Sequence, residues 1–186
     1  YRCSDEEVRK GKRLIVTSYN RYPDRAPAFS VLGLSLYNSE MPSIAGRGTL
    51  TIVDARQDFS SYLLSSGWSG LEASWVWSEG KQAHIMFRTT PNSDGTLKLD
   101  LEAFLPGPES VQLVSFSLNG KSVLQVIFST KNARQKISIP VPASDQAQDL
   151  RILIDKPISP KVAGISTDPR ELGVALFSLE YDGEKQ

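Results

Sequence analysis

Histidine and cysteine, which metal centres and nucleophilic catalysis use often, are almost missing from this sequence. Among 186 residues there is one histidine, His84, and one cysteine, Cys3. A single cysteine excludes a disulfide within the chain, and these two residues cannot supply the ligand set of a structural zinc site. We interpret Cys3 as an incidental free thiol, with pairing to a residue outside this chain as the alternative. We predict no metal site and no cofactor.

Catalytic motifs are also scarce. No Gly-x-Ser-x-Gly elbow and no phosphate loop of the Walker type occur, so a Ser-His-Asp triad would have to use His84. We expect His84 to be a surface or half-buried cross-strand partner instead. The run Asn92-Ser93-Asp94-Gly95 lacks the further acidic ligands of a calcium loop and is interpreted as a turn. No pair among the 21 acidic residues is marked out as glycosidase carboxylates, so we expect a non-catalytic chain.

An excess of charge of either sign is missing too. Lys and Arg together number 21, as do Asp and Glu, so there is no electrostatic case for binding nucleic acid or an anionic membrane surface. No run of about 18 apolar residues is present that would span a membrane. The chain begins at Tyr1 with neither a signal peptide nor a transit peptide. We expect a processed product or an excised piece of a larger protein.

Short apolar runs separated by turn residues follow one another along most of the chain, with almost no helical periodicity. Residues 81–88 alternate most clearly, with Ala83, Ile85 and Phe87 on one face. Asn119-Gly120 between two such runs predicts a hairpin with a type I′ turn. The predicted strands cover residues 14–16, 29–37, 49–53, 74–78, 81–88, 96–104, 111–118, 121–128, 137–141, 150–154 and 172–181. This pattern predicts an all-β fold, a β-sandwich or jelly roll resembling a carbohydrate-binding module.

The domain organisation follows from where this pattern is strongest. Residues 46–186 are predicted to form the β-sandwich domain. Residues 1–45 carry no assignable motif and are expected to pack on the sandwich. Residues 57–66 are expected to lead into the next segment through a helical turn.

All three tryptophans lie within residues 67–80. If residues 74–78 form a strand, Trp75 and Trp77 share one face of it, while Trp68 and Glu72 lie on the preceding loop. Buried indoles build a core, whereas exposed ones offer a flat apolar platform for a ligand. For Trp75 and Trp77 we favour the core. For Trp68 the two alternatives are equally open.

A second segment, residues 166–173, precedes the last predicted strand and carries Asp168 and Arg170. Arg170 can pair with Glu72 or Asp168 and join two loops, or present its guanidinium to a ligand carboxylate, phosphate or sugar hydroxyl. We favour the structural pairing. Aromatic faces stack on sugar C–H groups while Arg, Asp and Glu bond hydroxyls. The candidate ligand-binding residues are therefore Trp68, Glu72, Trp75, Trp77, Asp168 and Arg170.

These segments resemble the C-terminal extracytoplasmic domain of bacterial phosphoglycerol transferase I and of polytopic cell-envelope glycosyltransferases. The resemblance covers residues 49–182. It rests on Gly67-Trp68-Ser69-x-x-Glu72-x-x-Trp75-x-Trp77-Ser78-x-Gly80, on the strands around Asn119-Gly120, on Ser159-Pro160, and on Asp168-Pro169-Arg170-x-Leu172-Gly173-Val174. In that transferase, which decorates periplasmic glucans, the metal-dependent catalytic domain lies upstream, and none of its metal-ligand pattern is visible here. The resemblance implies a periplasmic accessory domain of an inner-membrane enzyme and supplies no catalytic residues.

Three functional hypotheses follow. In the first, a non-catalytic domain holds or orients an O-antigen or periplasmic glucan for the parent membrane enzyme, so its partners are the glycan and the rest of that enzyme. In the second, the same residues form a core and an inter-loop ion pair in a purely structural or protein-interaction domain. A third, a free-standing hydrolase, requires a deep cleft with two close carboxylates. Burial of the indoles distinguishes the first two hypotheses.

Overall fold

The computed structural model describes residues 64–72, 74–89 and 94–183, together with the backbone of four earlier strands. Every regular element in these residues is a β-strand, and within them there is no helix that could cross a membrane. The strands are β1 (Lys12–Thr17), β2 (Phe29–Val31), β3 (Leu34–Glu40), β4 (Thr49–Thr51), β5 (Trp68–Leu71), β6 (Val76–Glu79), β7 (Gln82–Phe87), β8 (Gly95–Ala103), β9 (Val111–Leu118), β10 (Lys121–Ser129), β11 (Arg134–Val141), β12 (Gln148–Ile154) and β13 (Leu172–Gly183).

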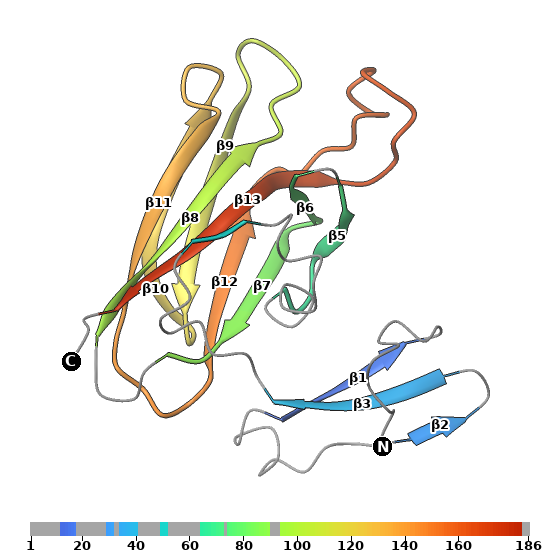
Figure 1. Cartoon of the computed structure of the whole chain (residues 1–186). Helices are drawn as coiled ribbons and strands as arrows, with labels where there is room; N and C mark the ends of the chain where they lie inside the picture. The colour runs from blue at the N-terminus through green and yellow to red at the C-terminus, as the bar shows by residue number, and fades with distance from the viewer. Residues whose placement is uncertain are drawn as a thin grey trace.

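Two antiparallel sheets form the body of the protein (Figure 1). The larger sheet has the order β11-β8-β13-β6-β5, with β4 also paired to β13, and the smaller has the order β10-β9-β12-β7. Buried apolar side chains of both sheets belong to one hydrophobic core. The predicted all-β sandwich is therefore confirmed.

The alternation of side chains explains why these sequences form a sandwich. In β8, Leu97, Leu99 and Leu101 are fully buried while the residues between them are half-buried. In β12, Leu150 and Ile152 are fully buried and alternate with half-buried or exposed neighbours in the same way. Such a period of two places one face of each sheet on the core and leaves the other to solvent.

The hairpin between β9 and β10 was predicted correctly. Asn119 and Gly120 have φ angles of 51° and 81°, which is the left-handed conformation that a type I′ turn needs at both central positions. The Asn119 side chain also accepts a hydrogen bond from the backbone of Asp149 at 2.8 Å and donates one to Gln148. The turn is therefore attached to the start of β12.

Several boundaries differ from the prediction. Residues 29–37 do not form one strand, because β2 and β3 are separate strands that pair with each other. The bulge in β13 between Leu176 and Ser178 interrupts the alternation of its side chains, so Leu176 rather than Phe177 shares the core face with Leu179 and Tyr181. Most of the helical turn expected within residues 57–66 lies outside the described residues.

The N-terminal strands form a three-stranded sheet of their own, with the order β1-β3-β2. By contrast, β4 pairs with β13 in the larger sheet. That residues 1–45 pack on the sandwich stays a prediction.

Candidate functional site

The tryptophan-rich segment folds as a hairpin of β5 and β6 at one edge of the larger sheet. Gly67 begins it with a φ of +75°, and a Cβ there would lie 1.9 Å from the Gln82 carbonyl oxygen, so only glycine fits. Ser78 in β6 is buried, and its Oγ accepts a hydrogen bond of 2.8 Å from the Val174 backbone N–H of β13. These contacts fix the hairpin against its neighbouring strands.

The loop between β12 and β13 brings Asp168 and Arg170 to this hairpin. Its first part is folded on itself, because the buried Ser159 accepts a hydrogen bond from the Val162 N–H at 3.0 Å. Its second part is closed by a hydrogen bond of 2.9 Å from the Lys161 N–H to the Asp168 carbonyl. The Asp168 carboxylate in turn accepts the Arg170 backbone N–H at 2.9 Å. The segment before β13 is therefore held in one conformation by its own backbone and side chains.

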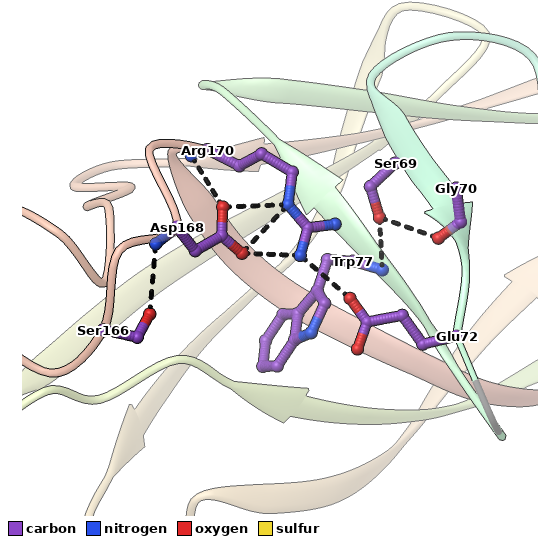
Figure 2. Close-up of polar contacts among 7 residues, drawn as sticks. All are labelled: Ser69, Gly70, Glu72, Trp77, Ser166, Asp168 and Arg170. Atoms are coloured by element: carbon purple, nitrogen blue, oxygen red, sulfur yellow. Dashed lines mark hydrogen bonds and ion pairs between the residues drawn. The ribbon is translucent and has the colours of Figure 1, made fainter.

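Arg170 joins the loop to the hairpin (Figure 2). Its Nη2 lies 2.6 Å from Asp168 Oδ2 and 2.9 Å from Glu72 Oε1, and its Nε donates to both Asp168 oxygens. The exposed fractions of the three side chains are 31%, 24% and 32% for Arg170, Asp168 and Glu72. The structural pairing favoured from the sequence is confirmed.

This ion-pair cluster has a clear electrostatic consequence. Hydrogen bonds from the Arg170 side chain and then from its backbone hold the pKa of the Asp168 carboxyl below its usual value. The bonds to Asp168 and then Glu72 raise the pKa of the Arg170 guanidinium further above its usual range. A glycosidase acid needs a raised pKa, so Asp168 does not fit that role. The free-standing hydrolase therefore gains no support from this pair of carboxylates.

Trp77 lies directly beside this cluster, with its ring next to the Arg170 and Glu72 side chains (Figure 2). Trp77 pairs with Ala175 of β13, which pairs on its other side with Glu102, so the indole belongs to the outer face of the larger sheet. Its edge meets the Phe104 ring at a centroid distance of 5.9 Å, and the indole is half-buried. A flat apolar surface thus adjoins three charged groups.

Trp75 extends the aromatic surface along the same face. Its ring centroid lies 5.6 Å from that of Phe177. The guanidinium of Arg134 lies 3.7 Å above the Phe177 ring and bonds both oxygens of Asp100 at 2.9 Å. The hydrogen bonds from Arg134 lower the pKa of the Asp100 carboxyl. The Trp75 indole N–H is buried without a hydrogen-bond acceptor in the part of the chain that is described.

The prediction for the tryptophans was wrong in its assignment of faces. Trp75 and Trp77 lie on the outer face and are not part of the core cluster. Trp68 is not on a loop but begins β5, where it packs against the core and donates its indole N–H to the His84 carbonyl at 2.8 Å. Trp68 is therefore separated from the candidate site, which consists of Glu72, Trp75, Trp77, Asp168 and Arg170.

Sequence reasoning also missed Phe104, Phe177, Arg134 and Asp100. Alternation within β8 and β11 puts polar residues on the outer face, and that signal was present in the sequence. What the sequence did not show is that β13 lies between β6 and β8, with β11 beyond β8.

His84 lies on the outer face of the other sheet. Its Nδ1 is 3.0 Å from Asp149 Oδ1 of β12, and its Nε2 contacts the Gln82 side chain. The expected role as a half-buried cross-strand partner is confirmed. Across residues 64–72, 74–89 and 94–183, no group of three or more His, Cys, Asp or Glu could hold a metal ion.

Neither a protein-family model nor a curated protein matches this sequence. Solved structures do resemble it. A family 35 carbohydrate-binding module from an environmental isolate is 12% identical, with a TM-score of 0.42, over 66% of this chain and 88% of its own. A family 6 carbohydrate-binding module is 8% identical, with a TM-score of 0.43, over 78% of this chain and 100% of its own.

A larger enzyme shows a similar likeness. The GH26-CBM35 β-(1,4)-mannanase of Podospora anserina is 13% identical over 74% of this chain, with a TM-score of 0.43. The match spans 28% of that enzyme's length. At these identities and TM-scores the likeness concerns the kind of fold, and no argument about function rests on it.

Proposed function

We propose that this chain is a non-catalytic β-sandwich domain that holds or orients a glycan on the outer face of its larger sheet. The observation that carries the proposal is the position of Trp77, whose half-buried indole lies beside the fixed cluster of Glu72, Asp168 and Arg170. A sugar ring presents apolar C–H faces and polar hydroxyls, so it needs an aromatic surface and hydrogen-bonding groups at one place. This site offers both.

The polar groups of the cluster suit hydroxyl ligands. The second terminal nitrogen of Arg170, Nη1, takes no part in the bonds to Asp168 and Glu72, so it is able to donate to a hydroxyl oxygen. The Asp168 and Glu72 oxygens accept hydrogen bonds from hydroxyl groups. Because the cluster is held in place before the ligand arrives, little side-chain entropy is lost on binding.

The wider context of this proposal is a bacterial envelope enzyme. We propose that the chain is a periplasmic accessory domain of an inner-membrane glycosyltransferase or phosphoglycerol transferase, with O-antigen or a periplasmic glucan as its ligand. The resemblance of residues 67–80 and 166–174 to the C-terminal domain of such transferases supports this context. The proposed partners are the glycan and the remainder of the parent enzyme.

A second candidate is a purely structural or protein-interaction domain. The observation that favours it is that Arg170 already bonds two carboxylates, while Trp75 and Trp77 already pack on Phe177 and Phe104. In that case the cluster serves to attach the loop before β13 to the hairpin, and the aromatic residues complete the sheet.

The experiment that separates these candidates is a titration of the 186-residue chain with linear and cyclic β-glucan oligosaccharides and O-antigen fragments. Tryptophan fluorescence and amide chemical shifts report binding. We expect saturable changes confined to residues 67–80, 100–104 and 166–177, which Trp77→Ala abolishes. Ile127→Ala, a change at a 64% exposed position on the other sheet, is the matched control and should leave them unaltered. No response at millimolar ligand would favour the structural candidate.

A further inference from the structure

The outer face around Trp77 carries an excess of negative charge. Glu79 follows Trp77 by two residues in β6, so it points to the same side of the sheet, and it is exposed. Glu102 lies two strands away in the same row, because Ala175 pairs with both Trp77 and Glu102. Both carboxylates are additional to those of Glu72 and Asp168. Acidic groups therefore lie in the cluster beside the indole, along its own strand and in its row across the sheet.

The cations of this face do not compensate for them. Arg170 bonds Asp168 and Glu72, Arg134 bonds both oxygens of Asp100, and Lys98 lies 3.3 Å from Asp182. On the described strands of this face and in the cluster, seven carboxylates stand against four cations: Glu72, Glu79, Asp100, Glu102, Asp168, Glu180 and Asp182 against Lys98, Arg134, Lys136 and Arg170. In the loop beside the cluster, Lys161 and Glu171 are exposed and have opposite charge.

From this arrangement we infer that the face selects uncharged glycans and rejects glycans that carry carboxylates or phosphates. The inference rests on the proposed glycan-binding function and narrows its ligand class. An anionic sugar would meet the carboxylates of Glu79 and Glu102, neither of which bonds a cation within the described residues, although Glu102 lies opposite Arg134. Otherwise it would have to compete with Asp168 and Glu72 for Arg170. Either course costs free energy that a neutral sugar avoids, because like charges repel and ion pairs must be broken.

Arg170 is the group that would otherwise argue for an anionic ligand, since arginine commonly binds phosphates and carboxylates through two parallel bonds. Here its Nε and Nη2 edge is occupied by Asp168, and Nη2 also bonds Glu72. A single remaining nitrogen, Nη1, suits one hydroxyl better than a bidentate anion. The geometry of the Arg170 bonds and the charge of the face thus both favour an uncharged glycan.

The test compares two hexasaccharides that differ only at C6. Cellohexaose is neutral, and its oxidised counterpart carries a carboxylate in place of each C6 hydroxymethyl group. Affinities for the 186-residue chain are measured by calorimetry at about 0.05 M and about 1 M salt. We expect cellohexaose to bind about tenfold more tightly at low salt. The difference should shrink at high salt, because the screening length falls to about 3 Å at 1 M.

Variants identify the charges responsible. The double change Glu79→Gln and Glu102→Gln should bring the two affinities closer together, mainly by improving that of the acidic hexamer. Asp145→Asn removes one carboxylate from an exposed loop that is not part of this face, and it is the matched control, with no effect on the ratio expected.

The outcomes separate the inference from the function on which it rests. Equal or tighter binding of the acidic hexamer would contradict the preference for uncharged glycans, but it would still support glycan binding. A preference for cellohexaose that neither salt nor the double variant alters would also overturn the inference, because the discrimination would then not be electrostatic. If the chain binds neither hexamer, the inference is overturned. If it also binds none of the β-glucan oligosaccharides and O-antigen fragments, the proposed function is overturned as well.

Discussion

Replacing Arg170 by alanine should loosen the contact between the loop before β13 and the β5–β6 hairpin. The side chain donates two hydrogen bonds from Nε to Asp168, at 3.1 and 3.0 Å. It donates two more from Nη2, at 2.6 Å to Asp168 and 2.9 Å to Glu72. Without the guanidinium, two neighbouring carboxylates lose their shared cation and repel each other. The hairpin and the loop should both become less stable.

The exposure of these groups sets the size of the effect. Exposed ion pairs contribute about 0.2–1 kcal/mol, whereas removing one partner of a fully buried pair costs about 3–5 kcal/mol. Arg170 keeps 31% of its side-chain surface exposed and therefore lies between these limits. We expect Arg170→Ala to lower the free energy of unfolding by about 1–2 kcal/mol. With a urea dependence of about 2 kcal/mol per molar, the unfolding midpoint falls by about 0.5–1 M.

Urea unfolding of the 186-residue chain, followed by tryptophan fluorescence and circular dichroism, measures this shift. Arg170→Lys keeps the charge but loses the planar fork, so its midpoint should lie between those of the wild type and the alanine variant. Arg151→Ala is the control, because its side chain is 46% exposed and makes one bond to Asp149, at 2.9 Å. An Arg170→Ala midpoint no lower than that of the control would mean that the guanidinium does not stabilise the contact between the loop and the hairpin.

The difference in stability between the wild type and Arg170→Ala should also depend on pH. Arg170 lowers the pKa of Asp168 in the folded state below the ordinary value of 3.8. A depressed carboxyl pKa stabilises the fold above the unfolded-state pKa, and this stabilisation is lost as the pH falls through the folded-state pKa. The difference in stability between the wild type and Arg170→Ala should therefore be constant near neutral pH and shrink below pH 3.8. A difference that grows on acidification contradicts this assignment.

Three further changes test other parts of the site by urea unfolding. Trp68→Ala should lower the free energy of unfolding by about 3 kcal/mol, because a large side chain that packs against the core is removed. Trp77→Ala should lower it distinctly less, and the reverse order would contradict the placement of Trp68 against the core and of Trp77 on the outer face. Gly67→Ala should destabilise by about 3 kcal/mol, because its Cβ would lie 1.9 Å from a backbone oxygen at a positive φ, and an unchanged midpoint would show that the hairpin entry can shift. Ser78→Ala leaves a buried backbone N–H without its acceptor and should cost about 1–3 kcal/mol, whereas a loss below about 0.5 kcal/mol would mean that the N–H finds another partner.

The errors in the sequence prediction have one common cause. The period of two correctly placed Trp75 and Trp77 on the same side of the hairpin, since alternation is a local property of the chain. It did not show which side faced the core, because that depends on the strand paired with β6. Val76 pairs with Leu176 of β13, and both are buried, so the tryptophans are turned outward.

Local sequence signals were sufficient to predict the all-β class, most of the strands of the sandwich and the turn at Asn119-Gly120, because periodicity and turn preference act between near neighbours. The sequence also suggested that Arg170 would meet Glu72, but their contact joins residues 98 positions apart. That contact, the packing of Trp68 against the core, the outward position of Trp77 and the acidic groups near the indole became evident only from the tertiary structure. These features depend on the order of strands across the sheets, and that order is set by the packing of the whole core rather than by any local stretch of sequence.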